Sequence, residues 1–333
     1  MTKLNQWLAS VAARRSSRAG LIASVALIAL MLQIGCKEAG PVFRQADGEV
    51  WTTRYRVVYR AAGPLEDSIV AELDAVDRSL SMFNPNSVVS MVNSNQNMAV
   101  DSTFADVFRI ARRVWQLSGG SYDPTVAPLV DLWGFGRRGC DSVAPSSLRL
   151  REALKSVGMG ECYISDGMVV KKSGATEFDF SSIAKGYAVD RIVGMLRRNG
   201  VDDYLVEIGG EVAAGGVNRE GRLWAVGIEN ASDLSTTDEM LLLENMAVAT
   251  SGNYRRYVEL LRAGRPEEYG HIIDPRSGFP RKGSVASATV VAPTCALADA
   301  LATACFVMSP TECRALEDSI EGVRIILNPL APQ

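Results

Sequence analysis

Two stretches in the first third of the chain repeat apolar residues at steps of three and four. The first stretch begins after Pro64 and carries Ile69, Leu73, Val76 and Leu80. The second is followed by Gly119-Gly120 and carries Phe104, Val107, Phe108, Ala111 and Trp115. This spacing places side chains on one face of a helix, proline is tolerated in a first helical turn, and glycine commonly ends a helix. The pattern predicts two amphipathic helices that pack against the rest of the protein.

Short segments rich in β-branched and aromatic residues indicate strands. We expect them at Trp51 to Arg60, Tyr204 to Ile208, Leu223 to Ile228, Met246 to Ala249 and Ala288 to Val291. Further helices are expected at about Ser182 to Arg198 and Leu297 to Met308. Mixed strands and helices are typical of the α+β class. Because no break in composition divides residues 50–333, we predict a single α+β domain there, in which residues 120–170 could form a lobe.

The first 36 residues differ in character from the rest. Four basic residues precede an apolar run from Leu21 to Leu32, and no acidic residue occurs before Cys36. This is typical of an export signal, and the run is shorter than the about 20 residues of a membrane-spanning helix. Gly35-Cys36 resembles a bacterial lipobox, although Gln33 stands where leucine is usual. We predict a lipoprotein signal peptide at 1–35, a polar tether at 36–49, and attachment to the inner membrane through lipidated Cys36, facing the periplasm. An uncut signal anchor is the alternative.

The composition, 47% hydrophobic and 22% charged over 333 residues, is that of a globular protein. Cleavage before Cys36 would remove four basic residues and leave 31 Lys and Arg against 38 Asp and Glu. A net charge of about −7 disfavours nucleic acid, whose binding requires neutralisation of phosphates. Cys140, Cys162, Cys295, Cys305 and Cys313 would remain, an odd number whose pairing stays open.

The single histidine, His271, lies in a turn that runs to Pro280 and contains two prolines and a glycine. A lone histidine is more often a packed or surface residue than a catalyst. In a turn that also holds acid and arginine, its pKa near neutrality suits proton transfer or a phosphate contact. From spacing alone, Asp274 could orient it.

The segment from Glu177 to Asp190 runs from a strand through a polar turn into a helix. The free N–H groups of a helix N-terminus, with Lys185 nearby, suit a diphosphate. The alternative is an ordinary N-cap at Ser181 or Ser182.

Asp299 and Thr303 lie four residues apart, so they share one helix face. Their oxygen atoms suit Mg²⁺, but they could equally serve the helix itself. Gly209-Gly210 follows a strand and lets a ligand approach the backbone, or serves a tight turn. The sequence has no Walker loop, no dinucleotide fingerprint and no serine elbow with a second histidine.

Taken together and in order, these segments resemble the ApbE family, the FAD:protein FMN transferases. The motifs that carry the resemblance are Ser81 to Ser87 with Asn93, Gly120 to Val126 running to Trp133-Gly134-Phe135-Gly136, Asp179 to Asp190, Ile208-Gly209-Gly210, Thr250 to Tyr254 with His271 to Pro275, and the helix with Asp299 and Thr303. Two departures concern local flavin contacts. Glu211 follows the glycine pair where a small or amide residue is common, and Met82-Phe83 replace a polar residue and a tyrosine.

The resemblance implies a flavin-transferase fold and Mg²⁺-dependent transfer of FMN from FAD to a threonine hydroxyl, with release of AMP. It implies acceptors among the flavoprotein subunits of Rnf and Nqr redox complexes. The implied metal ligands are Asp299, Thr303 and the backbone oxygen of Ser182, and the implied catalytic residues are His271, Asp299 and Lys185, with His271 activating the threonine. The implied FAD contacts are Leu80, Ser81, Met82, Tyr122, Asp123, Asp179, Lys185, Gly209, Gly210 and Ile273.

Two other functions compete with this interpretation. One is a metal-dependent FAD pyrophosphatase, in which water replaces the threonine and the products are FMN and AMP. The other is a lipoprotein that binds FAD without chemistry. The presence of His271, Asp299, Thr303 and Lys185 together counts against the second, because binding alone does not need both a metal site and a base.

Overall fold

A computed structural model describes residues 40–137, 139, 142–229, 236–253, 257–262, 264–281 and 285–329. The second of two compact units, residues 43–60 with 64–333, holds nearly all described residues. The predicted signal peptide and Cys36 lie outside the described residues. Within the described ranges, no helix is both long and apolar enough to cross a membrane.

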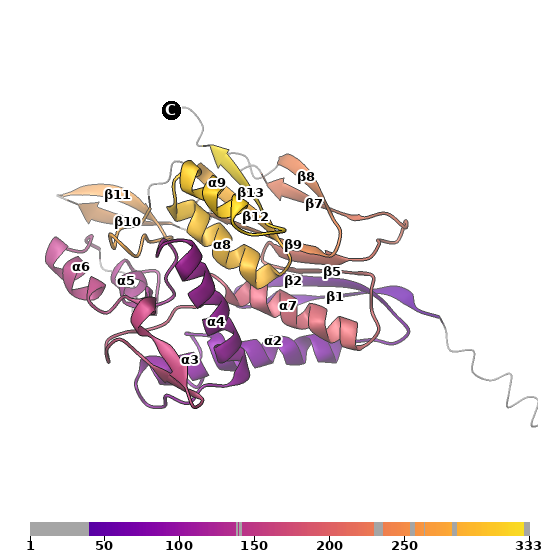
Figure 1. Cartoon of the computed structure of the whole chain (residues 1–333), viewed down its shortest axis with the longest axis horizontal. Coiled ribbons are helices and arrows are strands. Elements are labelled where there is room, and N and C mark those ends of the chain that lie inside the picture. The colour runs from indigo at the N-terminus through magenta and orange to yellow at the C-terminus, as the bar shows by residue number, and fades with distance from the viewer. Residues whose placement is uncertain are drawn as a thin grey trace, which may run out of the picture. The chain divides into compact units, whose positions relative to one another are not determined.

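A seven-stranded sheet forms the centre of the second unit (Figure 1). In sheet order the strands are β1 (Val42–Val50), β2 (Thr53–Ala61), β5 (Tyr204–Ile208), β6 (Glu211–Gly215), β9 (Met246–Gly252), β12 (Val285–Ala292) and β13 (Arg324–Pro329). From β2 to β13 every neighbouring pair is antiparallel. Three separate hairpins are β3–β4 (Tyr163–Ser165, Met168–Val170), β7–β8 (Trp224–Glu229, Thr237–Leu243) and β10–β11 (Tyr257–Arg262, Arg265–Gly270).

Helices cover one face of this sheet, and some of them lie beyond its end (Figure 1). They are α2 (Glu66–Leu80), α3 (Val88–Asn93), α4 (Ser102–Leu117), α5 (Ala127–Leu132), α6 (Ser147–Leu154), α7 (Ala184–Arg198), α8 (Cys295–Val307) and α9 (Pro310–Asp318), with a short 3-10 turn, η1 (Met159–Glu161). In Figure 1, α8 lies against β9 and β12, α7 lies beside it over β5 and β6, and α2 and α4 pack on these two helices. Because α8 is enclosed by the sheet and by other helices, almost all of its side chains are buried.

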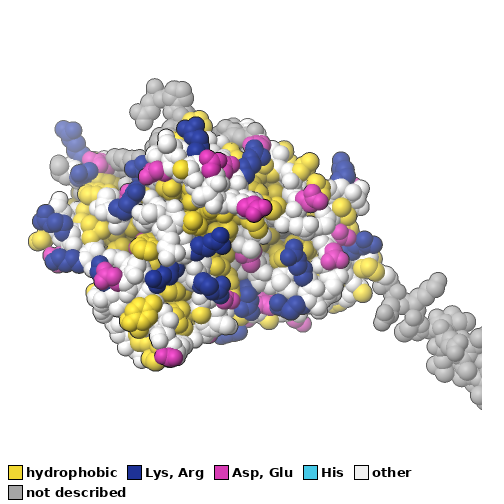
Figure 2. Space-filling model, in the orientation of Figure 1, with side chains coloured by type: hydrophobic (Ala, Val, Ile, Leu, Met, Phe, Trp, Pro, Cys, Tyr) yellow, Lys and Arg dark blue, Asp and Glu magenta, His cyan; other side chains and the backbone are white. Residues whose placement is uncertain are grey.

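The β7–β8 hairpin packs on the opposite face of the sheet. Val212 and Ala214 of β6 and Val248 of β9 point to this side and form a buried cluster with Leu241 and Leu243 of the hairpin. Both sides of β6 are therefore buried, which agrees with its unbroken buried pattern. On the face shown in Figure 2, hydrophobic side chains are interspersed with charged side chains of both signs.

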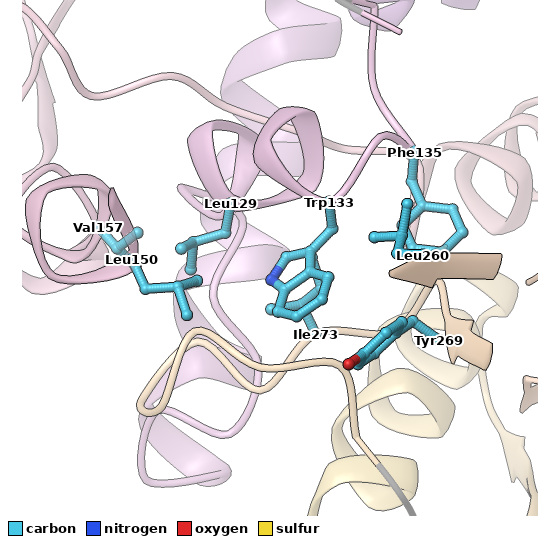
Figure 3. Close-up of a cluster of buried hydrophobic side chains, with 8 residues drawn as sticks. All are labelled: Leu129, Trp133, Phe135, Leu150, Val157, Leu260, Tyr269 and Ile273. Atoms are coloured by element: carbon cyan, nitrogen blue, oxygen red, sulfur yellow. The ribbon is translucent and has the colours of Figure 1, made fainter. Parts of the chain in front are cut away.

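A second apolar cluster joins α5 and α6 to the β10–β11 hairpin (Figure 3). The ring of Trp133 lies 4.7 Å from that of Tyr269, and its Nε1 donates a 2.8 Å hydrogen bond to the carbonyl of Gly278. Ile273 lies against the same cluster. This cluster therefore anchors the two ends of the segment that carries His271.

The α+β class and the four predicted helices are confirmed. The polar tether predicted at 36–49 is wrong where the structure describes it, because Val42–Val50 form the edge strand β1. An edge strand with largely exposed side chains lacks the apolar alternation by which a strand is found. Trp51 and Thr52, predicted to begin the next strand, instead form a turn with positive φ, and β2 begins at Thr53.

Candidate active site

A cavity of about 270 Å³ lies on the helix side of the sheet, where the β5–β6 turn meets the end of β9. It gathers most of the predicted site, namely Met82, Tyr122, Asp123, Asp179, Ser182, Lys185, Gly209, His271, Ile273, Asp299 and Thr303. We call it the reaction cavity. A larger cavity of about 870 Å³ adjoins it through Met82, Asp179, Lys185 and His271, and its lining includes Leu80 and Ser81.

Lys185 lies between two acidic side chains in the reaction cavity. Its Nζ is 2.7 Å from Oε1 of Glu211 and 3.8 Å from Oδ2 of Asp299. Burial alone would lower the pKa of Lys185, but the charges of Asp299 and Glu211 outweigh burial and raise it. Burial raises the pKa of both carboxyl groups, an effect that Lys185 partly offsets. Lys185 is therefore a permanent cation, and its side chain keeps 30% exposure to the cavity.

Glu211 reaches this cluster because of the tight turn before it. Gly209 and Gly210 have φ of +61° and +101°, a conformation that favours glycine. The turn pairs Ile208 with Glu211, so both side chains point to the helix face. Sequence comparison treated Glu211 only as a departure from the family pattern, and its pairing with Lys185 was missed.

Asp299 and Thr303 both line the cavity from α8. Oδ2 of Asp299 accepts a 3.1 Å hydrogen bond from the N–H of Gly186, and the Thr303 hydroxyl lies 3.1 Å from that of Ser251. On the opposite wall, the Ser182 hydroxyl donates to Tyr122 at 3.3 Å. The two predicted metal ligands on α8 and Ser182 are thus brought to one cavity.

These oxygen donors fit a small divalent cation. Oε2 of Glu211 is buried and has no hydrogen-bond partner among the described residues. With both acidic side chains ionised, one ammonium leaves the cluster with a net negative charge, which a cation would neutralise. No group of three or more His, Cys, Asp and Glu side chains in the described ranges could hold a metal by itself. A cation here would therefore need hydroxyl, backbone or substrate oxygens as well, as Mg²⁺ commonly does.

The two other acidic residues of the predicted site hold their own loops. Oδ1 of Asp179 accepts from the N–H of Ser181 at 2.8 Å. Asp123 accepts from the N–H and hydroxyl of Thr125 and from the N–H of Met159, at 2.5 to 3.0 Å. Burial raises the pKa of Asp123, which those hydrogen bonds partly oppose. Its carboxylate fixes the shape of the cavity wall.

His271 lines both cavities, and its ring lies edge-on to that of Phe135 with 6.3 Å between centroids. The predicted pairing with Asp274 is wrong. Both carboxylate oxygens of Asp274 accept hydrogen bonds from the guanidinium of Arg276, at 3.0 and 3.1 Å. Asp274 also caps the N–H of Arg276, so this carboxylate closes the turn instead of orienting the histidine.

One predicted FAD contact, Gly210, does not line the reaction cavity. It lines a groove on the side of the sheet that carries the β7–β8 hairpin, and Gly209 lines both that groove and the reaction cavity. The described structure therefore places the turn between two hollows.

Comparison with known proteins agrees with this arrangement. The ApbE family pattern matches residues 51–327. The FAD:protein FMN transferase of Vibrio cholerae is 34% identical over 294 residues, covering 85% of this chain and 86% of that protein, and that of Haemophilus influenzae is 32% identical over 314 residues, covering 89% of each. The flavinyl transferase ApbE of Pseudomonas stutzeri, solved in its apo form, superposes with a TM-score of 0.78 at 31% identity, covering 90% of this chain and 94% of that one.

Proposed function

Because the chain belongs to the ApbE family and is an FAD:protein FMN transferase, we propose that it transfers FMN to a threonine hydroxyl of its acceptor in a Mg²⁺-dependent reaction. One observation carries this proposal. One cavity is lined by Lys185, Glu211, the pair Asp299 and Thr303, and the only histidine of the sequence, which come from four separate parts of the chain. An attack on a diphosphate needs these groups: positive charge, positioning and a base.

Asp299, Thr303 and the backbone oxygen of Ser182 would hold the metal. Bound there, Mg²⁺ would neutralise the diphosphate and the developing charge on the leaving AMP. Because α8 is buried along almost its whole length, it would hold Asp299 and Thr303 in fixed positions.

Lys185 contributes a permanent positive charge between Glu211 and Asp299. Its ammonium would contact the diphosphate of FAD while Glu211 fixes its direction at 2.7 Å. The rest of FAD would lie in the two adjoining cavities, in contact with Asp179, Met82, Leu80, Ser81 and the Gly209 backbone.

His271 would accept the proton of the acceptor threonine. The threonine oxygen then forms a bond to the phosphorus on the FMN side of the diphosphate, and the bond from that phosphorus to the AMP oxygen breaks. The products are FMN in phosphoester linkage to the protein, AMP, and a proton on the histidine. The packing of Phe135 and the Trp133 to Gly278 hydrogen bond hold the histidine segment at the cavity.

We also propose export and lipidation at Cys36, which would place the enzyme on the periplasmic face of the inner membrane. The basic and apolar pattern of residues 1–35 supports this. Flavoprotein subunits of Rnf-type and Nqr-type complexes are the proposed acceptors. Globomycin treatment of cells expressing the full chain should cause the uncleaved precursor to accumulate.

The reaction is tested by mixing the protein with FAD, Mg²⁺ and such an acceptor subunit. A fluorescent acceptor band with the mass of added FMN is expected, and it should disappear with EDTA and in Asp299→Ala and His271→Ala variants. Rapid turnover of FAD to free FMN and AMP without a labelled acceptor would instead identify a pyrophosphatase. Intact bound FAD with neither product would identify a binding protein.

A further inference from the structure

The β7–β8 hairpin exposes apolar groups on the side that does not pack on the sheet. Ala225 pairs with Leu242, and Gly227 pairs with Met240, so these four residues share one face, which we call the hairpin face. Leu242 is 66% exposed and Met240 is 58% exposed. A Cβ at Gly227 would lie 3.4 Å from Sδ of Met240, so the methionine lies over the glycine. Adjacent exposed apolar groups of this kind indicate an interaction surface.

A groove of about 380 Å³ adjoins the hairpin face. Its lining comprises Ala225, Val226, Gly227 and Glu229 of β7, Arg56, Leu205, Glu207 and Val212 of the sheet, and Gly209, Gly210, Thr250 and Gly252 at the sheet end. Ala225 and Gly227 belong to both the groove and the hairpin face. A molecule bound on the hairpin face could therefore extend into the groove and stay in contact with β7.

The groove and the reaction cavity lie on opposite faces of the sheet. Glu207 and Val212 are cross-strand partners and line the groove, whereas the next pair, Ile208 and Glu211, points to the helices. The two hollows nevertheless share Gly209, Thr250 and Gly252 in their linings. They meet around the end of the sheet, at a place where glycine leaves the backbone uncovered.

The meeting point is next to the turn that carries His271. The residue after Gly252 is Asn253, whose Oδ1 accepts a 3.2 Å hydrogen bond from the N–H of Ile272. Ile272 directly follows His271 in the chain. The side chain of Asn253 thus links the inner end of the groove to the segment that carries His271, the proposed base.

We infer that the hairpin face and the groove dock the acceptor protein, whose threonine-bearing segment lies extended in the groove and enters the reaction cavity past Gly209 and Gly252. This inference rests on the proposed function. Arg56 and Glu207 place one basic and one acidic side chain in the groove, which suits the peptide N–H and C=O groups of an extended segment. FAD and the acceptor would then reach the diphosphate from opposite faces of the sheet.

Two variants of the full chain test the docking surface. Met240→Ser with Leu242→Ser removes the apolar side chains of the hairpin face. Met168→Ser with Leu148→Ser is the matched control, because these residues are 49% and 61% exposed on β4 and α6. The probe is the flavin-binding domain of an Nqr-type acceptor subunit. Its Kd, measured without FAD, should rise about tenfold or more in the first variant and stay unchanged in the control.

Ala225→Trp tests the groove separately, because it fills the space without altering any group of the reaction cavity. Transfer to the acceptor should fall at least tenfold, while the affinity for FAD stays that of the wild type. Unchanged acceptor Kd in the hairpin variant would overturn the inference. So would a change in oligomeric state or in binding to anionic lipid vesicles without a change in acceptor Kd, since the hairpin face would then serve a second copy or a membrane. Because acceptor Kd is measured without catalysis, it separates failure of docking from failure of the transferase proposal.

Discussion

Asn93 closes a buried contact between distant segments, and its removal should cost much of the stability of the protein. Its Nδ2 donates to the carbonyl of Phe178 at 2.8 Å, and its Oδ1 accepts from the N–H of the same residue at 2.7 Å. Asn93 is 3% exposed and Phe178 is fully buried. In Asn93→Ala, both backbone groups would lose their partner where water does not reach them.

Each unpaired buried group costs about 1–3 kcal/mol, so the two groups together should lower the free energy of unfolding by about 2–6 kcal/mol. With a urea m-value of about 3 kcal/mol/M, the unfolding midpoint should fall by about 1–2 M. Asn93→Asp should recover little, because a carboxylate oxygen would face the Phe178 carbonyl. Since Phe178 precedes Asp179 of the reaction cavity, the affinity for FAD should also weaken.

The matched control is Asn97→Ala, which removes an amide that accepts one hydrogen bond, from Ala99, at an exposed position. It should change the free energy of unfolding by less than about 1 kcal/mol. If Asn93→Ala cost no more than Asn97→Ala in urea unfolding followed by circular dichroism, the assignment of Asn93 as a structural bridge would be refuted.

Three further predictions concern residues around the cavity. Burial raises the pKa of Glu211 to about 7, so the native state binds a proton that the unfolded chain releases near pH 4.5. The free energy of unfolding should therefore fall by up to about 3 kcal/mol as pH rises from about 4.5 to 7. Urea titrations should show that Glu211→Gln flattens this dependence. Trp133→Phe removes the buried hydrogen bond to Gly278. It should lower the free energy of unfolding by about 1–2 kcal/mol and also lower kcat for FMN transfer. An unchanged kcat would show that this bond does not position the His271 turn. Asp190 accepts hydrogen bonds from the first two N–H groups of α8 at 2.7 and 2.9 Å. Asp190→Ala should cost about 1–2 kcal/mol and lower Tm by about 2–3 °C in calorimetry, whereas an unchanged Tm would contradict its role as a helix cap.

The parts of the fold with a strong apolar period could be predicted from the sequence. The helix that ends at Leu80 buries every third or fourth side chain, and the strand Tyr204–Ile208 buries every second one, so both patterns are visible in the sequence. The β10–β11 hairpin was missed because Arg265, Glu267 and Glu268 fill β11 with polar side chains. Only pairing with its neighbour, which periodicity does not record, makes that segment a strand.

In the candidate site, too, some features could be predicted from the sequence and others depend on the fold. Resemblance identified the segments that meet, but two side-chain partnerships depend on the folded backbone. The ion pair of Glu211 with Lys185 follows from the turn that points Glu211 to the helices. The binding of Asp274 to Arg276 follows from the closed turn, and spacing alone suggested the wrong partner for that carboxylate.

The burial of α8 has a consequence for how the enzyme loses activity. Local opening of a protein spares the most deeply enclosed elements, which exchange their amide protons only when the whole domain unfolds. Asp299 and Thr303 stand on such an element, between the sheet and other helices. The proposed metal site would therefore not unfold locally before the whole domain unfolds. Heat inactivation and global unfolding should occur at one temperature, and the amides of α8 should be among the last to exchange with solvent.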